Sequence, residues 1–231
     1  MSTTFDSLID SLPDQPEGRP PGPGRLVTWR PALLAAPPLV ATLLGLAHPH
    51  HLHAATASRW LVLHIILLFV FPLIAVGLIA VVFHAAPCLP ARHLIVGGTV
   101  VTAVLCAVCY STLDVLAGIG AGVLVGQGLA TGELDPQILA LQRVAEPFGT
   151  AGGAALVCCA ALAGYAVWTA VGRAALPGVL LTLVGAWGLV QNHVYWPLGT
   201  LTTLSLAAGV WVLARAVSGY PGRSGCDNPK S

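Results

Sequence analysis

The feature that most constrains this chain is a series of long apolar stretches that contain almost no charged residues. Residues 59–84, for example, read RWLVLHIILLFVFPLIAVGLIAVVFH, and the one formal charge is Arg59 at the first position. Only 8% of the 231 residues are charged, whereas a soluble domain has about a quarter. The polar side chains are too few to cover the surface of a globule in water, so we expect lipid to surround most of the protein.

The lengths of these stretches predict how often the chain crosses a membrane. A bilayer core is about 30 Å thick, and a helix needs about 20 apolar residues to cross it. Six stretches meet or approach that length: residues 27–47, 59–84, 94–114, 148–172, 174–191 and 196–215. The fifth is short, so five spans with a re-entrant segment is the alternative count. The sequence therefore predicts an all-α polytopic transmembrane helix bundle of about six spans.

The two ends of the chain differ from this apolar region. Residues 1–25 are rich in proline and glycine and contain no apolar run, which predicts a disordered tail and not a signal peptide. Residues 218–231 have the same character. The expected organisation is a transmembrane helical domain over residues 26–217 between two disordered cytoplasmic tails.

Basic residues are concentrated in alternate connectors, and this sets the expected orientation because cytoplasmic loops carry an excess of Lys and Arg. One side collects most of them: Arg19, Arg25, Arg30, Arg92, Arg173, Arg215, Arg223 and Lys230. The opposite connectors hold only Arg59 and Arg143, together with three acidic residues, Glu133, Asp135 and Glu146. We therefore expect a multi-pass protein of the cell membrane with both termini in the cytoplasm. The absence of a basic cluster in the sequence makes nucleic acid an unexpected partner.

Residues 94–130 form an unusually long apolar region with a single formal charge, Asp114, in 37 positions. A straight helix of that length would measure about 55 Å, so we expect the chain to bend, break or follow the membrane surface near Asp114. After it, Gly118, Gly122 and Gly126 repeat every four residues. Such a stripe lets another helix approach closely, which predicts a helix-packing surface that a second copy of the chain or a partner helix can use.

Histidines gather at the outer side of the predicted bundle. Four lie within six positions of the first outer connector and two lie near outer span ends: His48, His50, His51, His53, His64 and His193. Neutral imidazoles bind Zn, Cu, Ni and haem iron, so these six residues are candidate ligands of a transition metal or a haem. Asp114 and, one turn deeper, Tyr110 are expected at the depth of His64. We expect an imidazole N–H of His64 to donate to Asp114, with Asp114 and Tyr110 orienting the ligands or relaying protons.

Three functions remain open from these residues. The first is an outward-facing metal or haem site used for redox chemistry or metal handling, and the second is a small proton-coupled transporter that uses Asp114 and His64. The third is a non-catalytic membrane scaffold or accessory subunit whose histidines sit at the membrane interface. The run HPHHLH matches no standard spacing of zinc ligands. The sequence therefore does not decide whether the protein is an enzyme. A copper(I) site is disfavoured because Met1 is the only methionine.

Other motifs in the sequence do not indicate catalysis. The pair Cys106 and Cys109 lies inside an apolar run, where cysteine behaves as a small hydrophobe, and an i, i+3 pair on a helix closes poorly into a disulfide. The chain has no Walker-type loop and no Gly-x-Ser-x-Gly elbow. The bias toward Ala, Val, Leu and Gly is typical of a bacterial protein from a GC-rich genome.

Overall fold

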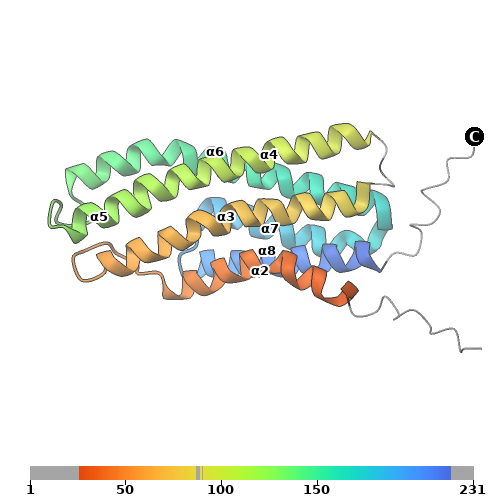
Figure 1. The fold of residues 1–231 in the computed structure, drawn as a ribbon, viewed down its shortest axis with the longest axis horizontal. Coiled ribbons are helices and arrows are strands. Elements are labelled where there is room, and N and C mark those ends of the chain that lie inside the picture. The colour runs from red at the N-terminus through yellow and green to blue at the C-terminus, as the bar shows by residue number, and fades with distance from the viewer. Residues whose placement is uncertain (1–25, 87–88, 90, 220–231) are drawn as a thin grey trace, which may run out of the picture.

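The computed structural model describes residues 26–86, 89 and 91–219, and these form a bundle of helices that lie side by side along one long axis (Figure 1). Residues 1–25, the predicted N-terminal tail, lie outside the described residues, and so do residues 220–231 of the tail predicted at 218–231. Ser218 is instead the last residue of α8. The helical elements in chain order are α2 (Leu26–Ala47), α3 (Ala57–Ala85), α4 (Arg92–Leu113), the π-helix η2 (Asp114–Gly120), α5 (Ala121–Gly126), α6 (Pro136–Val171), the 3₁₀-helix η3 (Gly172–Ala175), α7 (Leu176–Asn192) and α8 (Leu198–Ser218).

The prediction of an all-helical fold is confirmed for the described residues. They contain no β-strand, and the single β-bridge joins His53 to Gly132 in two connectors. By length and composition, five helices are long and apolar enough to cross a membrane: Arg30–Ala47, Ala57–Ala85, Arg92–Gly126, Pro136–Asn192 and Leu198–Ser218. The fourth of these contains both α6 and α7, which pack against each other on either side of η3.

Many large apolar side chains are exposed on the outer surface of the bundle, which is compatible with a lipid environment. On α3, the side chains of Phe69, Leu73 and Val76 are each more than half exposed, and similar side chains line the other helices. The opposite face of α3 is buried, with Leu67, Phe71 and Ile74 in the core. A helix with apolar side chains on both faces has no polar face to turn toward water, so α3 is compatible with a membrane span.

The start of α6 differs from the prediction. The sequence indicated a span from 148, but the helix begins at Pro136, and Arg143 and Glu146 lie on it instead of in a connector. The reason is local: the carboxylate of Asp135 caps the helix by accepting a hydrogen bond from the Gln137 N–H at 3.0 Å, and proline is favoured in the first turn. Hydropathy alone does not report this polar first part of the helix.

The region around Asp114 also differs in part from the prediction. The helix that begins at Arg92 does not break but continues to Gly126, with a π-helical segment from Asp114 to Gly120 inside it. Short π-helical segments interrupt α-helical register and are frequent at functional sites. The change of register begins at Asp114, which is the only charged residue between Arg92 and the end of this long helix at Gly126.

The glycine stripe packs against α3 of the same chain. A Cβ at Gly118 would meet the ring of His64, and one at Gly122 would lie 3.2 Å from the Cβ of Leu61. At Gly126 the nearest atom is the Cβ of Ala57 at 3.7 Å, an ordinary contact. The stripe thus brings η2 and α5 close to α3 inside the bundle, and a role in binding a separate chain stays a prediction.

Candidate metal site

Three of the residues singled out in the sequence meet at one place in the bundle. His64 lies on α3, Asp114 begins η2 and His193 follows α7. One ligand atom from each, an imidazole nitrogen or a carboxylate oxygen, lies within 4.8 Å of the other two. Ligand atoms around a tetrahedral ion with bonds of 2.0–2.2 Å are about 3.3–3.6 Å apart, so a movement of about an ångström would bring all three onto one ion.

His64 has the orientation expected of a histidine ligand. Its Nδ1 is 2.8 Å from the carbonyl oxygen of Trp60, one turn earlier on α3, so the Nδ1–H donates there and Nε2 carries the free lone pair. A backbone carbonyl that holds the second ring nitrogen is a common partner of metal-binding histidines. The residue is buried, and its ring packs against Gly118, where no larger residue leaves room.

Asp114 is the most unusual residue of the site. Its side chain is 0% exposed, and neither carboxylate oxygen has a hydrogen-bond partner. The hydrogen bond that the sequence predicted from His64 to Asp114 is therefore absent, because His64 donates to Trp60. A carboxylate without partners is costly to bury, and a bound cation is one way to compensate that cost.

His193 reaches the site because of the backbone at the end of α7. It has φ 47° and ψ −141°, a sparsely populated region for a residue with a Cβ, while its N–H still bonds to the carbonyl of Leu189 at 2.9 Å. The ring is half-buried. Burial, and next the imidazoles of His64 and His48, lower the pKa of His193 to about 3. The ring is therefore neutral at pH 7 and able to bind a metal.

His48 is the one histidine of the outer connector that lies inside. Its ring makes edge-on contacts with Trp60, His64 and Tyr195, at centroid distances of 4.8, 5.1 and 4.7 Å. Nδ1 is 2.8 Å from the carbonyl oxygen of Pro49, and burial lowers the pKa of His48 to about 4. This imidazole is thus also neutral at pH 7, although it lies outside the group of three ligand atoms.

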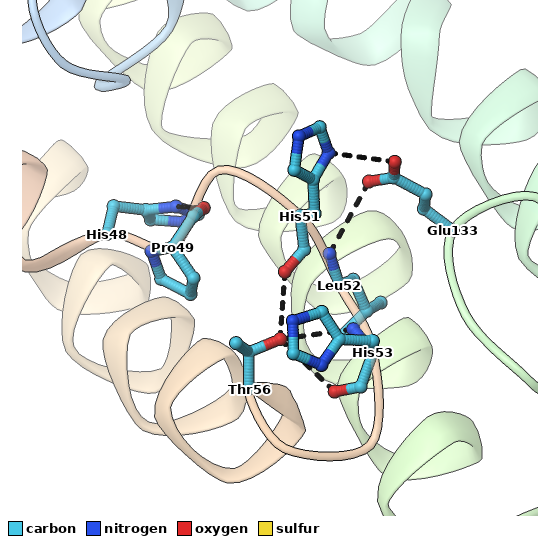
Figure 2. Close-up of polar contacts among 7 residues, drawn as sticks. All are labelled: His48, Pro49, His51, Leu52, His53, Thr56 and Glu133. Carbon is cyan, nitrogen blue, oxygen red and sulfur yellow. Dashed lines mark hydrogen bonds and ion pairs between the residues drawn. The ribbon is translucent and has the colours of Figure 1, made fainter.

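The other histidines of the connector are exposed and lie apart from the site. Figure 2 shows His51 directed toward Glu133, with 2.9 Å between its Nδ1 and the carboxylate, while the second oxygen of Glu133 accepts the Leu52 N–H at 3.4 Å. Thr56 closes the same loop, because its hydroxyl bonds to the carbonyl oxygen of His51 at 2.8 Å. His50, His51 and His53, all predicted as ligands, are therefore on the surface of the connector.

A cavity of about 540 Å³ lies beside the three central residues, within the size range of small-molecule sites. His64, Asp114, His193 and Tyr110 all line it. Its lining also includes the aromatic side chains of Trp60 and Tyr195, several apolar side chains, and four polar residues of α6: Gln142, Arg143, Glu146 and Thr150. Burial and then the charges of Asp114 and Glu133 raise the pKa of Tyr195 to about 12, so it is a neutral hydrogen-bonding group.

The geometry fits a bare ion better than a haem. The rings of His64 and His193 are nearly parallel, at 14°, with centroids 6.5 Å apart, which resembles a pair of axial ligands. However, Asp114 has an oxygen within 4.8 Å of a nitrogen in each ring, and a carboxylate is not among the usual ligands of haem iron. Two imidazoles and a carboxylate form instead a donor set used for zinc and non-haem iron.

The predicted site residues include the three central ones and also three histidines that lie elsewhere, and they do not include Trp60 or Tyr195. The signal for Trp60 was its position one turn before His64, and that for Tyr195 was its position two residues after His193. Asp114, expected to orient a ligand, lies among the possible ligands themselves.

Comparisons of the chain with protein-family models, with curated proteins and with solved structures find no match.

Proposed function

We propose that this chain is an integral membrane protein that binds a divalent transition-metal ion through His64, His193 and Asp114. The observation that carries the proposal is the convergence of these three donors around Asp114, whose buried carboxylate has no hydrogen-bond partner. A divalent cation would neutralise that carboxylate and use the free Nε2 of His64 at the same time. A group of structural hydrogen bonds would instead leave the donors and acceptors paired with one another.

The donor set favours a particular class of ion. Imidazole nitrogens suit zinc, copper(II), nickel and iron, whereas calcium and magnesium prefer oxygen ligands throughout. No thiolate or thioether belongs to the group, which disfavours soft copper(I). Three protein ligands leave the ion at least one further coordination position, which another side chain or an exchangeable ligand from the cavity can fill.

The position of the site supports a role at the outer side of the membrane. The distribution of basic residues favours a cytoplasmic position for both termini. With α6 and α7 counted as separate crossings, the chain would cross six times, and the connector at residues 48–56 and His193 would lie on the opposite side. A metal bound there would lie beside the cavity of about 540 Å³. The function that this arrangement supports best is metal handling, or metal-dependent chemistry, on the side of the membrane opposite the cytoplasm.

The experiment is metal analysis of the detergent-purified protein and three variants, His64→Ala, His193→Ala and Asp114→Asn, after loading with Zn²⁺ or Co²⁺ and removal of free metal. We expect about one ion per chain in the wild type and little in the variants. His84→Ala is the matched control, because His84 lies on the same helix and bonds in the same way to the carbonyl four residues earlier, at 2.7 Å. Its metal content should equal that of the wild type.

Two results would overturn the proposal. A folded wild-type protein that retains no metal excludes a metal site. A content that falls equally in His84→Ala shows that the loss reflects general destabilisation. If the wild type binds no metal and instead moves protons in vesicles in a manner that depends on His64, the transporter function takes its place.

A further inference from the structure

The buried polar atoms without a partner are concentrated around the candidate metal site. Among the described residues, four buried side-chain atoms lack a hydrogen-bond partner: His48 Nε2, Trp60 Nε1 and the two carboxylate oxygens of Asp114. Native proteins leave few such atoms, and each one calls for an explanation such as a bound ion or water. A metal held by His64, His193 and Asp114 explains the carboxylate of Asp114 but leaves the nitrogens of His48 and Trp60 without a partner.

The Nε2 of His48 has the properties of a metal ligand. Its other ring nitrogen bonds to the carbonyl oxygen of Pro49, so Nε2 is the nitrogen with the free lone pair. The side chain is only 5% exposed, which keeps water from satisfying that lone pair. Its ring is in edge-on contact with that of His64, at a centroid distance of 5.1 Å and an angle of 78°.

The backbone around His48 allows a small movement. The residue follows the last position of α2 and precedes Pro49, so its backbone belongs to a connector and not to a helix. Its N–H makes one bond, to the carbonyl oxygen of Gly45 at 3.3 Å. A reorientation of the His48 side chain about its own torsions therefore does not require either neighbouring helix to move.

We propose that His48 is the fourth protein ligand of the metal, and that it joins His64, His193 and Asp114 when the ion binds. This inference rests on the proposed function and extends it by one residue. The metal then has three imidazole nitrogens and one carboxylate oxygen, a four-coordinate set that zinc and cobalt(II) accept. Because His48 lies in the connector, binding also links the outer loop to the helix bundle.

The test is to count the imidazole ligands of the loaded protein. Pulsed electron paramagnetic resonance of the Cu²⁺ form, or X-ray absorption of the Zn²⁺ form, distinguishes two from three coordinated imidazoles. We expect three in the wild type and two in His48→Phe, which keeps an aromatic ring in contact with Trp60 and Tyr195. The dissociation constant should rise by at least about tenfold. His50→Phe, on the same connector but exposed, is the matched control and should retain three.

The possible outcomes separate this inference from the proposed function. A wild type that binds one ion with two imidazoles overturns the role of His48 and leaves the three-residue site standing. A count of three in both the wild type and His48→Phe overturns it as well. If His48→Phe fails to fold, the number of coordinated imidazoles in the wild type and in His48→Gln still decides whether His48 is a ligand. A wild type that binds no ion rejects both proposals.

Discussion

The ring of His64 lies directly against the backbone of Gly118. A Cβ built at Gly118 would overlap the imidazole carbons of His64 and would lie 2.7 Å from its Cβ. Gly118 belongs to the π-helical segment that begins at Asp114, so the same turn that places the carboxylate also makes room for the imidazole. The glycine is therefore part of what holds the two residues at a common depth.

Replacing Gly118 with alanine should displace His64 and damage the site. Overpacking of this kind costs about 1–3 kcal/mol, and we expect a lower melting temperature in detergent together with at least a tenfold weaker affinity for Co²⁺. Gly126→Ala is the control from the same stripe. Its nearest neighbour is 3.7 Å away, so its stability should be unchanged or greater by up to about 1 kcal/mol. Equal effects of the two substitutions would contradict this relationship.

Replacing Asp114 with leucine should separate stability from metal binding. Leucine has a similar shape and removes a buried carboxylate that has no partner, so the metal-free protein should become more stable by about 1–3 kcal/mol. The stabilisation that metal gives to the wild type should disappear at the same time. Thermal unfolding in detergent with and without Zn²⁺ measures both effects. If Asp114→Leu instead destabilises the metal-free protein, the carboxylate has a structural partner and the proposal fails on this point.

Replacing His51 with alanine should have little effect on metal binding. The His51 side chain is 74% exposed, and its contact with the Glu133 carboxylate is a surface interaction of a kind that contributes about 0–1 kcal/mol. We expect the affinity for Zn²⁺, measured by competition with a chromogenic chelator, to change by less than about twofold. His193→Ala should abolish binding in the same assay. A large loss in His51→Ala would move the site outward to the connector.

The cap of α6 should depend on pH through Asp135. Its carboxylate accepts the N–H groups of Gln137 and Thr131, each at 3.0 Å, and these bonds lower the pKa of Asp135. The lowered pKa means that the cap is fully present above the usual carboxyl value of about 3.9 and is lost as the pH falls through the folded-state value. Hydrogen exchange of the two amides should therefore lose its protection below about pH 4.

The comparison variant for this cap is Asp135→Asn. Its amide oxygen still accepts hydrogen bonds but does not titrate, so the protection of Gln137 should show no step in this range. A step of the same size in both proteins would assign the pH dependence to another group.

Much of the helical architecture was predictable because hydropathy is a local property of the chain. A run such as residues 59–84 has nowhere to place its apolar side chains except in lipid or in the bundle, whichever neighbours it has. The predictions were less accurate where local polar chemistry dominates. The cap at Asp135 starts α6 before its apolar part, and the helix continues past Asp114 through a π-helical segment, so that neither boundary follows hydropathy.

The site was predictable in its residue types but not in its membership. The sequence determined that the chain is helical and apolar and that its imidazoles gather near Asp114 in depth, because depth along a span follows from counting residues. Only the tertiary structure decided that His64, Asp114 and His193 converge, that His48 turns inward and that His51 turns outward to Glu133. Those choices depend on how α3, η2 and α7 are rotated about their axes and on the path of the connector. They are set by packing between segments far apart in the chain, such as the contact of Gly118 with His64.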